Sequence, residues 1–193
     1  MTVLETPRLI LRGWRESDRE PFATMCADPL VMRHFPAQLS RVECDRMVDS
    51  IAAHFDRHGF GLHAVEVRET GAFAGFIGLT VPTFQAHFTP GVEIGWRLAV
   101  AYWNRGFATE GAREVLRYAF DVLALREVVS FTVPANFASR RVMEKLGMSR
   151  DEADDFDHPN LPEGHPLRRH VLYRLVAPAS WPVQAGEAGP GAF

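Results

Sequence analysis

The residues best suited to chemistry in this chain lie between Val92 and Gly111. An apolar, β-prone run (92–100) leads into a short turn, and apolar residues then recur at helical spacing over 112–123. Gly106 and Arg105 stand where that helix would begin. A helix start leaves N–H groups unpaired and carries partial positive charge, so such a turn can hold a phosphate. We expect it to bind the pyrophosphate of a cofactor.

The neighbouring residues fit that expectation. Gly106 lets the backbone approach phosphates, and Ala108 is small for the same reason. Thr109 can donate a hydroxyl hydrogen bond, and Arg105 adds a cation beside Phe107. The alternative is that Gly106 marks a plain turn at the start of a helix.

A carboxylate on the preceding strand could handle protons. Glu93 is our candidate general base, acting directly or through a water molecule. The alternative is a surface or ion-paired strand residue. Glu110 is a weaker candidate, because we expect it in the first helical turn as a partner of the helix dipole.

The elements that must position these residues alternate along the chain. Ser17 and Glu20 predict a capping box and a helix start at Ser17, and Ser139 is predicted to cap a later helix that stops at Gly147. The expected strands are 8–15, 62–68, 74–81, 92–100, 127–133 and 170–176. The expected helices are 17–27, 40–57, one that begins at the Gly106 turn and ends near 123, and 139–146. This order predicts a mixed α/β fold with hairpins early and crossover helices late.

Composition excludes several classes of protein. A formal net charge of −3 argues against a general nucleic-acid binder. Cys26 and Cys44 form neither a disulfide framework nor a metal-ligand set, and the His54/His58 pair has no third ligand, so we expect no metal. With no signal-peptide pattern and no apolar run near the ~18 residues of a membrane span, we expect a cytoplasmic protein with no membrane partner.

Two segments near the C-terminal end have a composition that predicts their structure. The acidic run at 151–157 is expected to be either a solvated loop or a surface that attracts a cationic amine. Residues 1–177 are expected to form one domain, and the Gly- and Pro-rich segment 178–193 a disordered tail.

Two motifs together resemble those of the GNAT family of N-acetyltransferases. Residues 102–110, Tyr-Trp-Asn-Arg-Gly-Phe-Ala-Thr-Glu, look like its acetyl-CoA loop, and residues 133–148 look like its Asn-x-x-Ser helix. The opening run 6–12, Thr-Pro-Arg-Leu-Ile-Leu-Arg, resembles the ribosomal-protein-alanine acetyltransferase branch. Trp103 stands where the family loop usually has Gln or Arg, a departure that is usual in that branch.

The resemblance implies a GNAT acyl-CoA N-acyltransferase fold. That fold has a central twisted, mostly antiparallel sheet with a splayed central pair of parallel strands, flanked by helices. It further implies acetyl-CoA as co-substrate and a primary amine, either a protein N-terminus or a small amine, that attacks the thioester directly. The alternative is a catalytically silent module that binds acyl-CoA as a sensor or partner. The protein would be a monomer or a homodimer.

The resemblance also implies site residues. Leu98, Ala99 and Val100 would lie along the pantetheine arm. Asn136 would contact CoA through its amide or serve as a turn residue, and Ser139 would contact CoA or cap its helix. Many relatives carry a Tyr, the acid for the departing thiolate, at the position of Met143, which cannot donate a proton.

Overall fold

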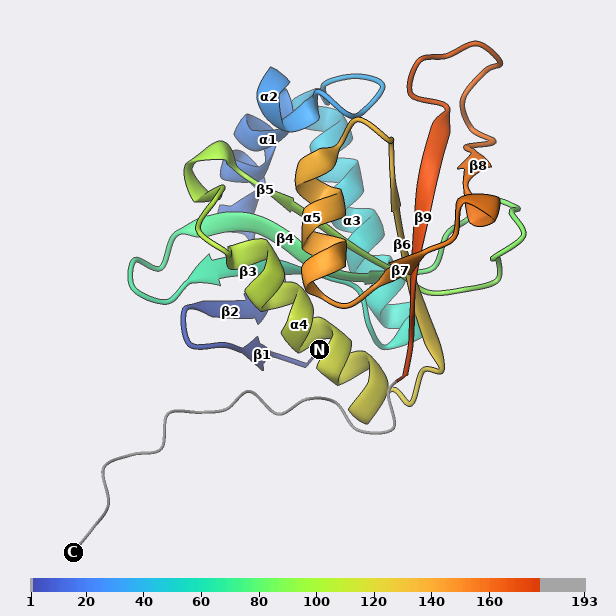
Figure 1. Cartoon of the computed structure of the whole chain (residues 1–193). Coiled ribbons are helices and arrows are strands. Elements are labelled where there is room, and N and C mark those ends of the chain that lie inside the picture. The colour runs from blue at the N-terminus through green and yellow to red at the C-terminus, as the bar shows by residue number, and fades with distance from the viewer. Residues whose placement is uncertain (1, 178–193) are drawn as a thin grey trace, which may run out of the picture.

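A twisted mixed sheet forms the centre of the protein in the computed structural model, which describes residues 2–177 (Figure 1). The strands are β1 (Leu4–Glu5), β2 (Leu9–Arg12), β3 (Leu62–Val67), β4 (Phe73–Thr80), β5 (Glu93–Leu98), β6 (Glu127–Thr132), β7 (Ser149–Arg150), β8 (Phe156–Asp157) and β9 (Arg169–Val176). The helices are α1 (Arg19–Ala27), α2 (Pro29–Met32), α3 (Arg41–His58), α4 (Phe107–Asp121) and α5 (Phe137–Lys145), with 3-10 turns at Glu16–Asp18, Val100–Tyr102 and Glu152–Asp154.

One parallel pair interrupts an otherwise antiparallel sheet. The strand order is β1-β2-β3-β4-β5-β6-β9-β7, and β8 pairs with β9. Only β5 and β6 run parallel, and a single residue pair, Glu93 with Val129, joins them in the described chain. The two strands therefore diverge beyond Glu93. The predicted mostly antiparallel sheet with a splayed parallel pair is confirmed.

Helices cover both faces of this sheet (Figure 1). α4 and α5 lie on one face, where Ile94 and Leu98 of β5 are buried against the core of α4. α1 and α3 pack on the other face around Phe22 and Phe76. Because side chains alternate along a strand, Glu93, Gly95 and Arg97 face the α1–α3 side.

Residues at the two ends of α3 determine where this helix begins and ends. Ser40 and Glu43 form a capping box: the Ser40 side chain accepts from the Glu43 N–H, and the Glu43 carboxylate accepts from the Ser40 N–H. The helix ends at Gly59, which is left-handed with φ 76°. The predicted helix at 40–57 is confirmed.

The predicted helix start at Ser17 is wrong. Residues Glu16–Asp18 form a 3-10 turn, and α1 begins at Arg19. The carboxylate of Asp18 accepts from the Arg15 N–H at 2.7 Å and is held by Arg12. A charged acceptor makes the stronger hydrogen bond, so Asp18 rather than Ser17 organises this turn. The segment after α1 contains the short helix α2.

Two glycines of β4 lie in close contact with neighbouring backbone. A Cβ on Gly78 would lie 2.1 Å from the Gly61 carbonyl oxygen, and one on Gly75 would lie 2.1 Å from that of Arg97. Neighbouring backbones therefore approach β4 where only glycine fits.

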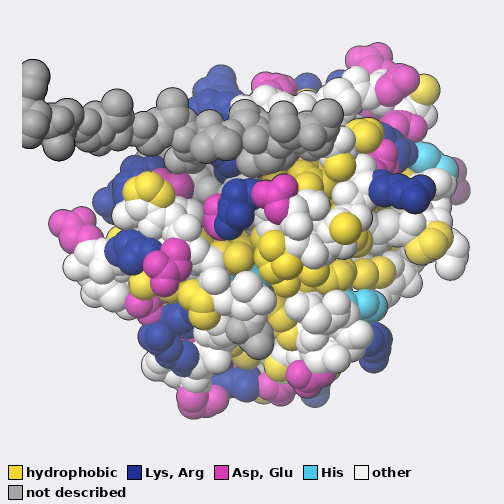
Figure 2. Space-filling view, turned by 90° about the horizontal axis from the view of Figure 1, so that it is seen from below, with side chains coloured by type: hydrophobic (Ala, Val, Ile, Leu, Met, Phe, Trp, Pro, Cys, Tyr) yellow, Lys and Arg dark blue, Asp and Glu magenta, His cyan; other side chains and the backbone are white. Residues whose placement is uncertain are grey.

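Viewed from below, a band of apolar side chains crosses the molecule between charged residues (Figure 2). No helix of the described chain is long and apolar enough to cross a membrane. The predicted tail, 178–193, lies outside the described residues.

Candidate active site

The gap between β5 and β6 exposes backbone donors. The N–H of Ala99 pairs with Ala74 of β4, and the antiparallel ladder alternates from there. The N–H groups of Trp96 and Leu98 therefore point toward β6, where no strand residue of the described chain pairs with them. Such donors can stabilise negative charge that develops on a carbonyl oxygen.

Glu93 stands at the point where the two strands separate. It is half-buried between Thr80 of β4 and Val129 of β6. Within residues 2–177 its carboxylate makes no hydrogen bond or ion pair. Desolvation by burial raises the pKa of Glu93 to about 8. A carboxyl group with that pKa can exchange a proton near neutral pH.

The turn after β5 presents unpaired donors. Gly106 is the N-cap of α4 and is left-handed, with φ 80°. It has no side chain to cap the first helical turn, so the N–H groups of Phe107, Ala108 and Thr109 lack an intrahelical acceptor. This arrangement suits an anion.

An ion pair ties this turn to the start of the chain. The Glu110 carboxylate accepts from Thr6 Oγ1 at 2.7 Å and from Arg8 Nε at 2.6 Å. Arg8 Nη1 in turn donates to the Arg105 carbonyl at 3.0 Å. The Glu110 carboxylate therefore stabilises the turn. Glu93 remains the stronger candidate for the general base.

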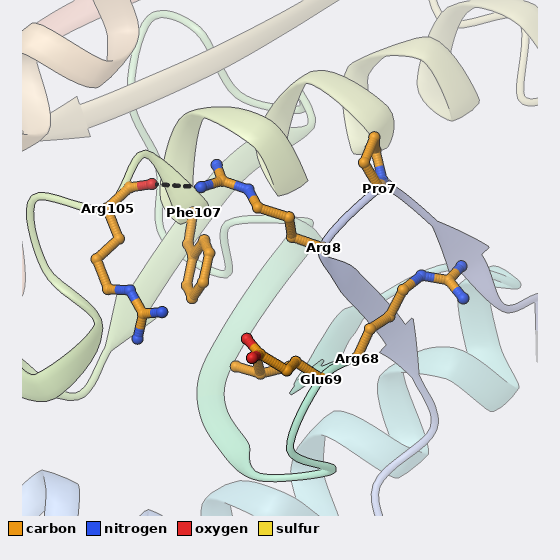
Figure 3. Close-up of a pocket in the computed structure, with 7 residues that line it drawn as sticks. Pro7, Arg8, Arg68, Glu69, Arg105 and Phe107 are labelled. Atoms are coloured by element: carbon orange, nitrogen blue, oxygen red, sulfur yellow. Dashed lines mark hydrogen bonds between the residues drawn. The ribbon is translucent and has the colours of Figure 1, made fainter.

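A cavity of about 310 Å³ opens beside the turn, lined by Pro7, Arg8, Val67, Arg68, Glu69, Arg105 and Phe107 (Figure 3). The guanidinium groups of Arg8 and Arg105 each lie 4.8 Å from the centroid of the Phe107 ring. Arg68 points away from that ring and pairs with Glu5. Two cations therefore flank the first residue of α4.

The contacts of Trp103 explain why a Trp stands in the loop where the family usually has Gln or Arg. Its Nε1 donates to the Leu98 carbonyl at 2.7 Å, and Arg33 lies 5.6 Å from the centroid of its ring. The indole thus fixes the turn to the end of β5, where Leu98, Ala99 and Val100 follow one another.

Asn136, not Ser139, caps α5, which corrects the predicted cap. Asn136 Oδ1 accepts from the Ser139 N–H at 3.2 Å, and Asn136 Nδ2 donates to Thr132 Oγ1 at 3.0 Å. The helix begins at Phe137, two residues before the predicted start. Met143 of this helix is 1% exposed, packed in the core beside α4.

The remaining charged candidates have structural partners. Within the acidic run, Asp154 pairs with Arg174 and Asp155 with Arg150, so much of its charge is neutralised. His54 contacts the Phe60 carbonyl through Nδ1 and accepts from the Val81 N–H through Nε2. Residues 2–177 hold no cluster of three His, Cys, Asp or Glu side chains arranged for a metal ion.

Comparison with known proteins decides the family. A sequence profile described as an acetyltransferase (GNAT) domain matches residues 8–149. The chain belongs to the GNAT acetyltransferase family. Acetyl transfer from acetyl-CoA is the chemistry that this membership supports.

Two relatives illustrate this membership. The chain is 39% identical over 120 residues to the FsC-acetyl coenzyme A-N(2)-transacetylase of Aspergillus fumigatus, matching 56% of this chain and 51% of that protein. It therefore spans about half the length of that relative. It is 28% identical over 178 residues to the uncharacterized N-acetyltransferase YnaD of Bacillus subtilis, matching 90% and 96% of the two chains.

Solved structures agree on the GNAT fold. An acetyltransferase (GNAT family) from Bacillus anthracis superposes with a TM-score of 0.75 and 25% identity, over 91% of this chain and 99% of that one. The ribosomal-protein-S5-alanine acetyltransferase of Vibrio fischeri gives a TM-score of 0.70 at 14% identity, over 95% and 100% of the chains. The second likeness concerns the fold alone.

Proposed function

We propose that this protein transfers the acetyl group of acetyl-CoA to a primary amine, with Glu93 as the general base. The observation that carries the proposal is the position of Glu93: an unpaired carboxyl group with a pKa of about 8, where β5 and β6 separate. The amine nitrogen attacks the thioester carbon directly, a C–N bond forms, and the C–S bond breaks.

The amine must lose protons to form the amide, so the reaction needs a base. A primary amine has a pKa of about 10, so it is mostly protonated at neutral pH and loses two protons in forming an amide. One leaves to water when the neutral amine forms, and Glu93 takes the other, directly or through a water molecule. The thiolate of CoA is a stable leaving group, since a thiol has a pKa of about 8.5. No acid is then required where Met143 stands.

The thioester oxygen needs donors as charge develops on it. The N–H groups of Trp96 and Leu98 face the gap beside β6 and are suited to this task. The pantetheine arm would run along Leu98, Ala99 and Val100, which have no strand partner on the β6 side within residues 2–177.

Phosphate binding falls to the turn before α4. We assign the pyrophosphate to Arg105, Gly106, Phe107, Ala108 and Thr109, because the N–H groups of the last three are uncapped and Arg105 adds charge. Asn136 and Ser139 are retained as CoA contacts by resemblance alone. Both polar atoms of the Asn136 amide already have protein partners, so we expect its contact through the remaining lone pair of Oδ1.

A silent CoA-binding module is the second candidate. The observation that favours it is Met143, buried and without a proton to donate. Residues 1–177 would form one domain in either case, since the described strands share one connected sheet.

The experiment that separates the two candidates measures thiol release from acetyl-CoA over a panel of amines, together with CoA affinity. Amine-dependent release supports the transferase. Tight CoA binding without release to any amine supports the module, and a protein that binds no CoA contradicts both.

A further inference from the structure

Arg97 carries a positive charge that no acidic residue of the described chain neutralises. Its Nη1 lies 3.3 Å from Cys26 Sγ, and its guanidinium lies 4.1 Å from the centroid of the Phe35 ring and 5.3 Å from that of Phe76. Its Nε is buried and has no hydrogen-bond partner among the described residues. No carboxylate of residues 2–177 forms an ion pair with it.

A buried arginine on the same sheet shows the contrast. Arg12 lies on β2, and its guanidinium pairs with Asp18 and Glu66, each at 2.7 Å. A buried charge is costly unless it is paired. Aromatic rings and the Cys26 thiol offset part of that cost for the half-buried Arg97, but they give its planar donors no charged acceptor. Arg97 is therefore suited to receive an anion from outside.

The surface between Arg97 and Glu93 is open. Gly95 lies between them on the same face of β5, and a Cβ placed there would have one neighbour within 4 Å, Glu93 Oε1 at 4.0 Å. With a rise of about 3.3 Å per residue, the Cα atoms of Glu93 and Arg97 stand about 13 Å apart. The strand thus presents a base at one end, bare backbone in the middle, and a cation at the other end.

We infer that the acceptor is a small amine that also carries a carboxylate. The amine lies beside Glu93, the chain of the acceptor crosses Gly95, and the carboxylate pairs with the guanidinium of Arg97. A guanidinium matches a carboxylate in shape as well as in charge, and two parallel N–H···O bonds can form. This assignment rests on the proposed function, because it names the substrate class of the same site.

A protein N-terminus and a small amino acid differ in the charge that they offer to Arg97. In a protein N-terminus, the carboxyl group of the first residue is part of a peptide bond and carries no charge. A free amino acid with its amine several bonds from its carboxylate supplies both groups. The separation between Glu93 and Arg97 favours a chain of several methylene groups between them.

The test is a matched series of acceptors. Glycine, β-alanine, 4-aminobutyrate, 5-aminopentanoate and 6-aminohexanoate are each compared with the corresponding carboxamide, by thiol release from acetyl-CoA. The wild-type protein should prefer the carboxylate by about tenfold or more in kcat/KM for the best chain length, the discrimination expected of a charged hydrogen bond. Equal rates for acid and amide across the series would overturn the inference.

Variants separate recognition from structure. Arg97→Gln should abolish the carboxylate preference and leave the rates with carboxamides within about twofold of wild type, which a merely structural arginine would not do. Arg33→Gln, an exposed arginine over the Trp103 ring, is the matched control and should keep the preference. If Arg97→Gln does not fold, Arg97→Lys serves, and it should lower the preference because it lacks the bidentate fork. A carboxylate preference equal to that of wild type in the folded variant contradicts the inference.

Two outcomes tell the inference and the proposed function apart. Acetylation of benzylamine or of a peptide N-terminus, with no turnover of any amino carboxylate, overturns the inference and leaves the transferase standing. No thiol release with any of these amines overturns the proposed function and the inference with it.

Discussion

Glu93 of β5 pairs with Val129 of β6, and no other residue pair joins these two strands in the described chain. The two strands separate directly after this pair. It places one carboxyl group where two strands stop sharing hydrogen bonds, next to backbone N–H groups that face the gap. The proposed chemistry depends on this position.

The pH dependence of the reaction should report Glu93. The pKa of Glu93 is raised to about 8 by burial, so the carboxyl group is mostly protonated at pH 7 and cannot accept a proton. We expect kcat/KM to rise about tenfold per pH unit below the inflection and to level off above about pH 8. An acceptor whose amine pKa lies well below 7 keeps its own titration out of this range. A profile that is flat from pH 6 to pH 9 would contradict the assignment.

The same pKa affects stability. In the unfolded chain a glutamate has a pKa near 4.5, so between that value and about 8 the folded state binds more protons than the unfolded state. This contribution to stability is complete at low pH and is lost as the pH rises through about 8. Glu93→Gln lacks it, so the variant should gain about 1 kcal/mol or more relative to wild type between pH 6 and pH 9. Urea unfolding of both proteins at pH 6 and pH 9 measures the difference in their free energies of unfolding. The same difference at both pH values would argue against a raised pKa of Glu93.

Gly106 should be needed for CoA binding. Glu at this position places a negative charge at the start of α4, where the pyrophosphate is assigned, and should weaken CoA binding about tenfold or more by calorimetry. Gly147→Glu is the matched control, because Gly147 has the same φ of 80° just after α5, and a Cβ placed on it would have no neighbour within 4 Å. Backbone strain is then similar in both variants. An equal loss of CoA affinity in the two variants would contradict the assignment of the pyrophosphate to this turn.

Glu110 should stabilise the turn and leave catalysis to Glu93. Glu110→Gln weakens hydrogen bonds to Thr6 and Arg8 that are 2.7 and 2.6 Å long, and should cost about 1–3 kcal/mol in the free energy of unfolding. CoA affinity should fall with it, because Arg8 also holds the Arg105 carbonyl. The pH profile of kcat/KM should keep its inflection near 8. Loss of that inflection would show that Glu110, too, takes part in proton transfer.

Local patterns predicted much of the fold and the turn. The helix at 40–57 and the strand–turn–helix around Gly106 depend on neighbours a few residues apart, and both are present. The errors at helix starts arose where two capping residues compete. Asp18 displaced Ser17, and Asn136 displaced Ser139, because each also bonds a second side chain, Arg12 for Asp18 and Thr132 for Asn136.

Interactions between distant segments could not be predicted from the sequence. Arg8 and Glu110 are 102 positions apart, and nothing near either residue indicates the pair. Arg97 lies within the stretch that the sequence marked as important, yet its role depends on Cys26 of α1 and on Phe35, which follows α2. A polar residue inside an apolar strand was the one signal that could have drawn attention to it.

The most direct measurement compares wild type and Glu93→Gln in amine-dependent thiol release from acetyl-CoA, with CoA affinity measured in parallel. We expect kcat to fall about 10²- to 10⁴-fold, the usual contribution of a general base, while CoA binds as before. Glu114→Gln, which removes a carboxylate paired with Arg117 on α4, is the control and should leave kcat unchanged. A Glu93→Gln protein that turns over at the wild-type rate would show that Glu93 is not the general base.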